Sequence, residues 1–295
     1  MQFTEIRDGL SDFFRKHDYW LLPLLRSLTA FLVLLLSVLN FTRGITGGVF
    51  LLLIFMTILA SFLPWSVIPM EAGVLLLYCL YRSSLELALS AAVFFLLLTL
   101  VQSAFRGGYA VLIALMPLAF LFHIPYVLPM IAGLSLGLVA AVPIALGTML
   151  YYFLRLIAVK LGAEAGGSGV EELASRYGEL FLEYIGNREM VLLLFTLLLC
   201  FLAVFVIRSI PFDYSWYAAV LAGALLSLAA VFLGSGFLAG HSLLSELGAV
   251  ATSLGTAVLY ILFVHDADYR RTEKLQFEDD SYFYYVKAVP KRRSR

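Results

Sequence analysis

The chain has 295 residues, of which 62% are hydrophobic and 14% are charged, and its mean hydropathy is +0.96. In soluble domains roughly a quarter of the residues are charged. Twenty Lys and Arg residues balance twenty Asp and Glu residues, and this zero net charge argues against nucleic acid as a partner. These values exclude a soluble enzyme, a disordered protein and a secreted disulfide scaffold. They indicate an integral membrane protein whose first partner is the lipid bilayer.

Residues 1–20 are polar and carry both signs of charge, so they do not resemble a cleavable signal peptide. Apolar residues such as Phe3, Ile6 and Leu10 recur at helical spacing. We therefore expect a cytoplasmic amphipathic helix that lies on the membrane surface.

Residues 21–159 form the first part of the expected membrane bundle, in which long uncharged stretches are broken by proline. From Gly107 to Leu154 there are 48 uncharged residues, which as one helix would extend about 72 Å, so the chain must fold back. Six of the nine prolines lie between residues 64 and 143, and proline interrupts helices. The predicted segments are 21–41, 45–63, 67–81, 84–105, 108–123, 127–141 and 143–159. Segments 67–81 and 108–123 are short for a hydrocarbon core of ~30 Å.

Two further regions complete the expected fold. In the acidic loop 160–189, an apolar stripe after a glycine-rich stretch predicts an amphipathic helix on the surface of the bundle or bilayer, or else a gating or docking element. Region 190–265 predicts membrane segments near 190–208, 216–239 and 244–264. The fold class is therefore an all-α polytopic transmembrane bundle. It has ten segments, or eight if the two short ones are tilted, broken or re-entrant.

An internal repeat is one interpretation of two similar octapeptides. Val67–Val74 and Val127–Leu134 share five identities at a spacing of sixty residues. If the repeat units are 45–105 and 108–159, each holds three helices, and an odd number inverts the second copy. Many secondary transporters have inverted repeats, with sites near broken helices at the midplane. The alternative is a chance match, because the chain is rich in Leu, Val and Ala.

Five residues are predicted to be functional within the membrane. Glu71 ranks first, because it lies in the first octapeptide where the second has an apolar residue, and a charge deep in lipid costs at least ~2.5 kcal/mol. Glu86 ranks second, and Arg26 ranks third as a partner for Glu71. Pro69 and Pro129 open the two octapeptide helices. The alternative is that these charges are anchors that snorkel to the interface.

We expect the other polar residues of the bundle to lie at the membrane interface. Arg155, Arg208 and Glu246 lie near predicted helix ends, where they would anchor the helices. His123 is the only titratable group in the 48-residue uncharged stretch with a pKa near neutrality, and we interpret it as an interfacial residue. No motif predicts a metal, a cofactor or a catalytic residue.

The tail 266–295 is basic and rich in tyrosine. Segments 272–277 and 282–289 have strand-like patterns, and residues 278–281 form a turn signal. A lone two-stranded hairpin is marginally stable in water. We therefore expect it to lie on the protein's own cytoplasmic face or on the sheet edge of a cytoplasmic or membrane protein partner, through residues 270–295. The predicted partner-binding residues are Phe277, Tyr282, Tyr284 and Tyr285.

The distribution of cations predicts the orientation in the membrane. The C-terminal tail carries eight Lys and Arg residues, and Arg7, Arg15 and Lys16 lie near the other end. By the positive-inside rule both termini are cytoplasmic, which requires an even number of crossings. The short interior loops favour the opposite orientation, and we give the tails more weight.

The tail segment from Glu273 to Pro290, EKLQFEDDSYFYYVKAVP, resembles the ending of a family of uncharacterised multi-pass membrane proteins from clostridial Gram-positive bacteria. Phe14–Pro23, Ile124–Pro129 and Asp213–Trp216 share the resemblance. It implies a location in a bacterial plasma membrane, and it implies no activity, substrate or site residue.

Three functions are compatible with the sequence. The first is a transporter, permease or lipid-translocating protein, because helices are broken and a repeat is predicted. The second is a membrane scaffold or assembly subunit that docks a partner through its tail. The third, an enzyme that acts on a lipid-linked substrate, has no motif behind it.

Overall fold

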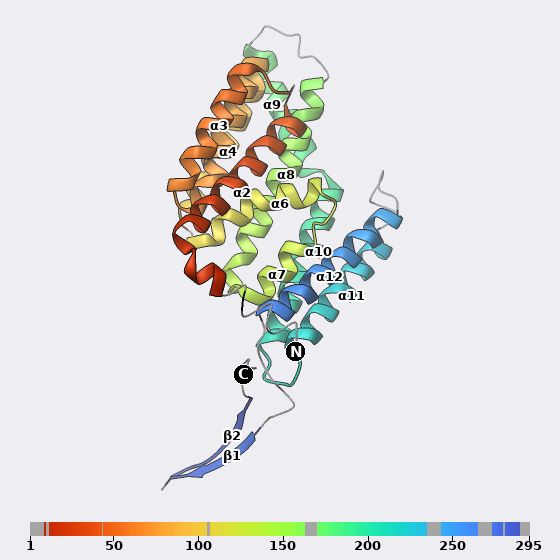
Figure 1. Ribbon diagram of the computed structural model, residues 1–295. Coiled ribbons are helices and arrows are strands. Elements are labelled where there is room, and N and C mark those ends of the chain that lie inside the picture. Colours follow the sequence, from red (N-terminus) through yellow and green to blue (C-terminus); the bar gives the residue numbers. More distant parts are fainter. Residues whose placement is uncertain are drawn as a thin grey trace.

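The computed structural model describes residues 9, 12–42, 44–104, 107–162, 170–234, 243–264, 273–279 and 281–289. In these residues the helices form one bundle and two strands form a separate hairpin (Figure 1). The helices are α2 (Asp18–Phe41), α3 (Gly47–Phe62), α4 (Ile68–Ser83), α5 (Leu85–Ser103), α6 (Val111–Leu121), α7 (Val127–Ser135), α8 (Ala141–Gly162), α9 (Val170–Ile185), α10 (Arg188–Ser209), α11 (Ser215–Gly234) and α12 (Leu243–Val264). Short 3-10 segments are η1 (Trp65–Val67), η2 (Gly107–Ala110) and η3 (Leu138–Ala140). The strands are β1 (Glu273–Glu278) and β2 (Phe283–Ala288).

Several helices have the length and composition of membrane spans. Within the described part of the chain, five qualify: Asp18–Phe41, Leu138–Lys160, Arg188–Ser209, Ser215–Leu233 and Leu244–Val264. Large apolar side chains such as Leu233 and Leu221 are exposed on their outer faces, which suits contact with lipid better than contact with water. The helices are compatible with an integral membrane protein. The predicted all-α bundle with a small C-terminal hairpin is confirmed.

The predicted helix positions hold within a few residues, with one clear exception. Segment 127–141 was expected to be one helix, but α7 ends at Ser135 after nine residues. Leu136 is extended, and a new helical segment starts at η3. The reason is a tertiary contact, because the Arg208 guanidinium on α10 donates a hydrogen bond to the carbonyl of Leu134 in the last turn of α7. With 11 and nine residues, α6 and α7 are both shorter than a membrane span.

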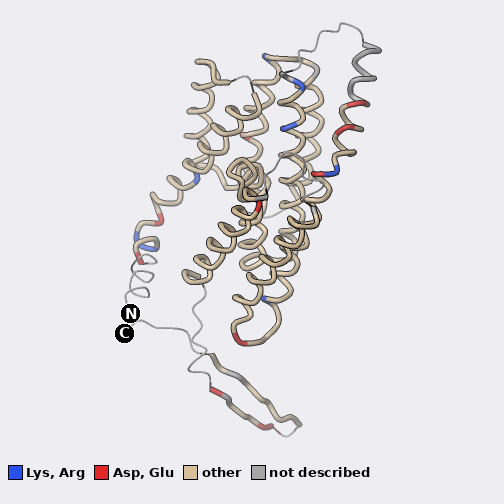
Figure 2. Tube along the Cα trace, turned by 90° about the vertical axis from the view of Figure 1, so that its right-hand side faces the viewer, with Lys and Arg blue, Asp and Glu red and all other residues tan. Residues whose placement is uncertain are grey.

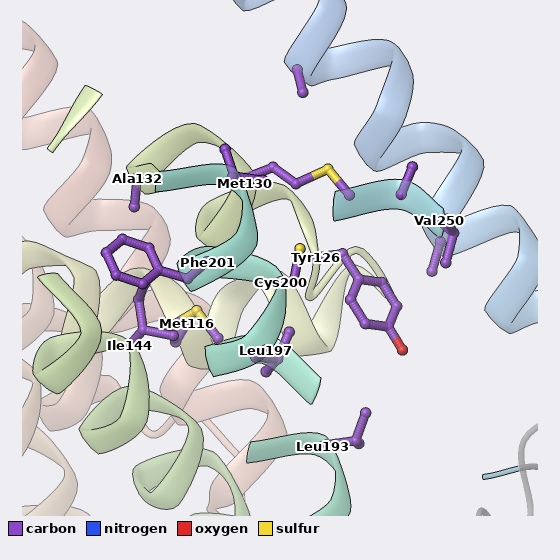
Figure 3. Close-up of a cluster of buried hydrophobic side chains, with 14 of the residues drawn as sticks. Met116, Tyr126, Met130, Ala132, Ile144, Leu193, Leu197, Cys200, Phe201 and Val250 are labelled. Carbon is purple, nitrogen blue, oxygen red and sulfur yellow. The ribbon is translucent and has the colours of Figure 1, made fainter. Parts of the chain in front are cut away.

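The short helix α6 lies where three packed groups of side chains meet. Its residues Leu112, Met116 and Phe120 belong to the largest core cluster, which also draws on α7, α8, α10, α11 and α12 (Figure 3). On other faces, Ala114 packs with α2, α3 and α4, and Ile113 packs with α5 and α8. The helix is fixed by contacts on all sides, although it is too short to span the bilayer.

Close backbone packing holds α6 and α7 against the long helices. A Cβ atom on Gly147 of α8 would lie 2.6 Å from Cβ of Met116 on α6. Likewise, a Cβ atom on Gly133 of α7 would lie 2.9 Å from Cβ of Val204 on α10. Such contacts need small residues, as is common where membrane helices cross.

The two predicted repeat units have unequal helices. Unit 45–105 contains α3, α4 and α5, with 16, 16 and 19 residues. Unit 108–159 contains α6, α7 and α8, with 11, 9 and 22 residues. The octapeptides open α4 and α7 with registers that differ by one residue, because α4 begins at Ile68, the second residue of its octapeptide, and α7 begins at Val127, the first. The inverted repeat itself stays a prediction.

The loop helix α9 lies on the bundle. Tyr184 is buried, and its hydroxyl donates a hydrogen bond to the carbonyl of Met149 on α8 at 2.9 Å. The Lys160 ammonium and the Glu183 carboxylate form an ion pair at 2.8 Å. Figure 2 shows charged residues on α9, at the start of α2 and on the hairpin, while most of the bundle is uncharged. The start of α2, the end of α12 and the hairpin lie at the same end of the molecule (Figure 1).

Candidate functional site

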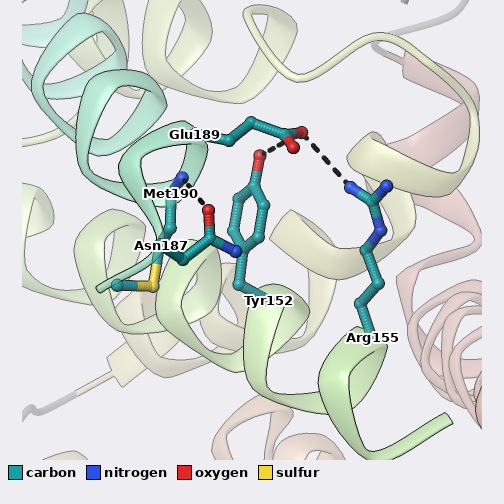
Figure 4. A network of polar contacts seen from close by, with 5 residues as sticks. All are labelled: Tyr152, Arg155, Asn187, Glu189 and Met190. Atoms are coloured by element: carbon teal, nitrogen blue, oxygen red, sulfur yellow. Dashed lines mark hydrogen bonds and ion pairs between the residues drawn. The ribbon is translucent and has the colours of Figure 1, made fainter. Parts of the chain in front are cut away.

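A polar network joins α8 to the start of α10 (Figure 4). The Tyr152 hydroxyl donates a hydrogen bond to Glu189 Oε1 at 3.0 Å, and Arg155 Nη1 lies 3.2 Å from the same oxygen. Tyr152 and Arg155 share one face of α8, because residues three apart are neighbours on a helix. Glu189 lies in the first turn of α10, where the helix dipole favours an acidic group. That turn begins with a cap, since the Met190 N–H donates to Asn187 Oδ1 at 3.1 Å.

A cavity of about 180 Å³ lies beside this network. Its polar wall comes from five separate parts of the chain: Asn40 of α2, His123 of the α6–α7 turn, Arg155 of α8, Glu189 of α10 and Glu246 of α12. Charged groups inside a bundle usually face its interior or a water-filled cavity, and such residues mark functional sites. This inner cavity is therefore the candidate functional site.

A second cavity, of about 330 Å³, adjoins the first. Asn40, Leu121, Tyr151 and Arg155 line both cavities. The outer cavity extends to Val159 in the last turns of α8. The two cavities thus share one wall, and together their lining residues extend from Val159 of α8 to the α6–α7 turn.

The α6–α7 turn has an unusual backbone. His123 has a φ of 57°, a left-handed conformation that side chains other than glycine rarely adopt. Around it the Ile124 N–H donates to the Ala119 carbonyl at 2.8 Å and the His123 N–H to the Phe120 carbonyl at 3.0 Å. These two bonds form a Schellman motif with His123 at the position where glycine is preferred. Strained backbone of this kind is concentrated at functional sites.

The part of the cavity wall that Glu246 forms is also held in place by a hydrogen bond. Tyr126 is 1% exposed, and its hydroxyl forms a hydrogen bond with the Glu246 side chain. Its ring belongs to the core cluster, with the hydroxyl pointing away from Met130 and Cys200 (Figure 3). The start of α12 is thereby tied to the start of α7.

The predicted residue Glu71 lies elsewhere, in the first turn of α4. It is 5% exposed, and neither of its carboxylate oxygens has a hydrogen-bond partner. Arg26, its expected partner, donates instead to the Leu63 carbonyl at 3.3 Å. No ion pair between Glu71 and Arg26 is present among the described contacts.

Three polar side chains nevertheless surround the turn between α3 and α4. Besides Arg26 and Glu71, Gln102 of α5 is 3% exposed and donates a hydrogen bond to the Ser66 carbonyl. The Nε atom of Arg26 and the Oε1 atom of Gln102 are buried without partners. None of these three side chains lines either of the two cavities.

The other predicted membrane residues are placed as follows. Pro69 and Pro129 are buried in the first turns of α4 and α7, where a missing N–H costs no helical hydrogen bond. Glu86 lies in the first turn of α5, and its side chain is outside the described part of the structure.

The predicted tail residues lie on the hairpin, whose strands are antiparallel. Phe277 pairs with Tyr284, and Leu275 pairs with Val286, so these four side chains share one face. Tyr285 lies on the other face opposite Gln276, and Tyr282 is in the turn. All of these aromatic residues are exposed.

The hairpin turn is organised by Asp279. Its Oδ1 atom accepts hydrogen bonds from the N–H groups of Ser281 and Tyr282 at 2.8 and 2.7 Å, and its Oδ2 atom accepts one from the Tyr284 hydroxyl at 2.8 Å. The hydrogen bonds from Ser281, Tyr284 and Tyr282 stabilise the carboxylate and hold the pKa of Asp279 below its usual value.

Comparison of the chain with protein-family models, curated proteins and solved structures finds no match. Its function is therefore inferred from the chemistry of the site.

The cavity residues were assigned other roles from the sequence alone. Arg155 and Glu246 were interpreted as anchors and His123 as an interfacial residue, whereas the structure places all three around one cavity with Glu189. A local signal is present in the sequence, because Tyr151, Tyr152 and Arg155 place polar groups close together on a mostly apolar helix. Nothing in the sequence indicated that residues 40, 123 and 246 come together.

Proposed function

We propose that the protein is a transporter-like or permease-like membrane protein whose ligand binds in the cavity at the α6–α7 turn. The observation that supports this is a pair of broken helices whose connecting turn lines a cavity with paired charges. Irregular backbone at membrane depth is tolerated where it is buried in protein or lines a cavity. Many secondary transporters bind their substrates at such breaks.

The arrangement suits a ligand with a polar or charged group. Glu189 orients Arg155, and Tyr152 holds Glu189 from the other side. The guanidinium is thus positioned before a ligand arrives, which reduces the entropy lost on binding. His123 and Asn40 add further polar groups on the facing walls.

The proposed orientation follows from the basic tails and from the resemblance to bacterial proteins. Both termini are then cytoplasmic and the membrane is a bacterial plasma membrane. Asn40 ends α2 and Glu189 begins α10, at the end of the bundle away from the hairpin. In this orientation the cavity opens toward the outer side.

Thiol accessibility tests the proposal without knowledge of the substrate. Cys79 and Cys200 are buried and would be replaced by alanine. Leu193 and Leu197, one turn apart on α10, are 5% and 0% exposed in the same core cluster, but Leu193 lines the inner cavity and Leu197 lines neither cavity. In proteoliposomes, a membrane-impermeant thiol reagent should modify the Leu193→Cys variant and leave the matched control Leu197→Cys unmodified.

The side from which labelling occurs separates the outcomes. Labelling of Leu193→Cys from both sides of the bilayer is expected of a transporter that alternates its access. Labelling from one side alone would reduce the proposal to a binding site. No labelling from either side would contradict it.

A second candidate function is a membrane scaffold or assembly subunit that docks a protein partner through residues 270–295. It is favoured by the exposed apolar face formed by Leu275, Phe277, Tyr284 and Val286. Crosslinking and pull-down with and without residues 270–295 test it. Loss of one specific partner on truncation would support docking, whereas an unchanged set of partners would contradict it.

A further inference from the structure

We propose that the ligand of this cavity is an anionic amphiphile, with a phosphate or carboxylate head that binds Arg155 and an apolar chain that leaves sideways between α2 and α8. This inference rests on the proposed function and adds the class of ligand. Four features of the two cavities support it.

The first feature is the depth of the mouth. The outer cavity lies between Asn40 and Phe41 in the last turn of α2 and Val159 near the end of α8. The ends of spanning helices lie at the level of the lipid headgroups. The mouth is thus placed where the polar head of a bilayer component lies.

The second feature is the surface around the mouth. Val159 is 63% exposed, and Leu39, next to Asn40 on α2, is 51% exposed. Both belong to segments long and apolar enough to span a membrane. A molecule that lies in the bilayer can therefore reach the mouth without crossing water.

The third feature is the charge of the lining. In the outer cavity the charged residue is Arg155, accompanied by the amide of Asn40 and the hydroxyl of Tyr151, and no carboxylate contributes to the wall. The inner cavity adds two carboxylates: Glu189 accepts hydrogen bonds from Tyr152 and Arg155, and Glu246 is hydrogen-bonded to Tyr126, so the anionic head is assigned to the outer cavity. Figure 4 shows the second terminal nitrogen of Arg155 pointing away from Glu189. A guanidinium held in this way suits the paired oxygens of a phosphate or carboxylate.

The fourth feature is an aromatic wall. The rings of Phe120 and Tyr151 are stacked with centroids 4.5 Å apart, and the ring of Phe41 meets Tyr151 edge-on at 6.2 Å. Phe41 and Tyr151 line the outer cavity, and Phe120 lines the inner one. A continuous apolar surface beside a cationic group is the lining that an amphiphile requires. A small inorganic anion would gain nothing from it.

Ligand binding to the purified full-length protein in a neutral detergent tests the inference. Three probes separate its parts: dodecyl phosphate, dodecylphosphocholine and inorganic phosphate. Dodecyl phosphate should raise the melting temperature in a concentration-dependent way. Dodecylphosphocholine, which has the same chain and a zwitterionic head, should bind at least about tenfold more weakly. Inorganic phosphate, which has no chain, should also bind at least about tenfold more weakly.

Variants on α8 locate the site. Arg155→Gln should weaken the binding of dodecyl phosphate by at least about tenfold, since a charge-assisted hydrogen bond is lost. Lys160→Gln is the matched control, because Lys160 is a cation on the same helix, pairs with Glu183 and lines neither cavity. It should bind as the unmodified protein does. If Arg155→Gln is unstable, the double variant Arg155→Gln/Glu189→Gln removes both charges of the ion pair, leaves neither partner charged alone, and should also fail to bind.

The remaining outcomes overturn the inference in distinct ways. Equal binding of inorganic phosphate would show that the site takes a free anion and no amphiphile. Equal binding of dodecylphosphocholine would show that the head need not carry a net negative charge, and unchanged binding by both Arg155 variants would show that the site is elsewhere. In each case labelling of Leu193→Cys still reports on the cavity itself, so the ligand class can fail while the proposed function stands.

Discussion

Among the carboxylates that are hydrogen-bonded to a tyrosine, Glu189 lies inside the bundle and Asp279 lies in the exposed hairpin. Glu189 receives the Tyr152 hydroxyl at 3.0 Å, and Asp279 receives the Tyr284 hydroxyl at 2.8 Å. The geometry is similar, but Tyr152 is 2% exposed whereas the hairpin is open to solvent. Water replaces a lost partner readily in the exposed hairpin, and less readily at the buried side chain of Tyr152. The same contact is therefore worth more inside the bundle.

Glu71 supplies the opposite case, because it is buried without a partner. Desolvation of its carboxylate costs free energy, and no hydrogen bond offsets this cost. Glu189 is partly buried and paired, Glu71 is buried and unpaired, and Asp279 is exposed and paired, so their comparison separates the effect of burial on stability from the effect of pairing. Substitution of each residue tests these effects.

The largest effect is expected at Glu189. Glu189→Ala leaves the buried Tyr152 hydroxyl without an acceptor, so the free energy of unfolding should fall by about 2–3 kcal/mol. Glu189→Gln keeps an acceptor and should cost less. Unfolding in mixed detergent micelles measures both variants, and equal losses for the two would mean that the hydrogen bond to Tyr152 contributes little.

The second largest effect is expected at Glu71, where substitution should raise the free energy of unfolding. Glu71→Leu removes an unpartnered buried carboxylate, and the free energy of unfolding should rise by about 1–2 kcal/mol. Glu71→Gln should give a smaller gain, because its amide still needs partners. A loss of stability in Glu71→Leu would show that the carboxylate has a partner. A gain would mean that the natural residue is retained at a cost in stability, as expected of a functional group.

A smaller effect is expected at His123. His123→Gly relieves the left-handed backbone and should raise the free energy of unfolding by about 0.5–1 kcal/mol. Tyr214, with a φ of 63°, lies away from the cavity, so Tyr214→Gly is a matched control for the backbone effect. If His123 serves the ligand, only His123→Gly should also weaken the binding of dodecyl phosphate. Equal binding by both variants would remove His123 from the site.

The smallest effect is the pH dependence of the hairpin. The pKa of Asp279 is lower in the folded hairpin than in the unfolded chain, so its contribution is present above the unfolded value of about 3.9. That contribution is lost as the pH falls through the folded value. The cross-strand amide shifts of the hairpin should therefore weaken in acid, as NMR of the full-length protein can measure. Asp279→Asn does not titrate at this position and should remove the change, whereas a transition that persists in this variant would belong to another group.

The helices could be predicted from the sequence because lipid burial depends on local length and composition. Charge gaps and prolines predict the positions of ten helices, and the structure agrees within about five residues for all of them except α7. Alternation of residue types predicts the two hairpin strands, whereas the pairing of Phe277 with Tyr284 comes from the structure alone.

The end of α7 and the cavity could not be predicted, because both depend on distant contacts. The Leu134 carbonyl is capped by Arg208, a residue 74 positions away. The cavity needs Asn40, Arg155 and Glu246 to meet in space, and each alone resembles an ordinary anchor at a helix end. The choice of a single charge by its place in a sequence motif therefore favoured Glu71, whose carboxylate has no hydrogen-bond partner, over charges that are paired around a cavity.

The central claim is that the α6–α7 turn lines a solvent-accessible ligand site, and thiol labelling with and without dodecyl phosphate tests it most directly. In the background without native cysteines, Leu193→Cys should react with a membrane-impermeant reagent, and dodecyl phosphate should protect it. Leu197→Cys should stay unreactive in both conditions. Equal inertness of the two variants, or equal reactivity unaffected by dodecyl phosphate, would contradict the claim.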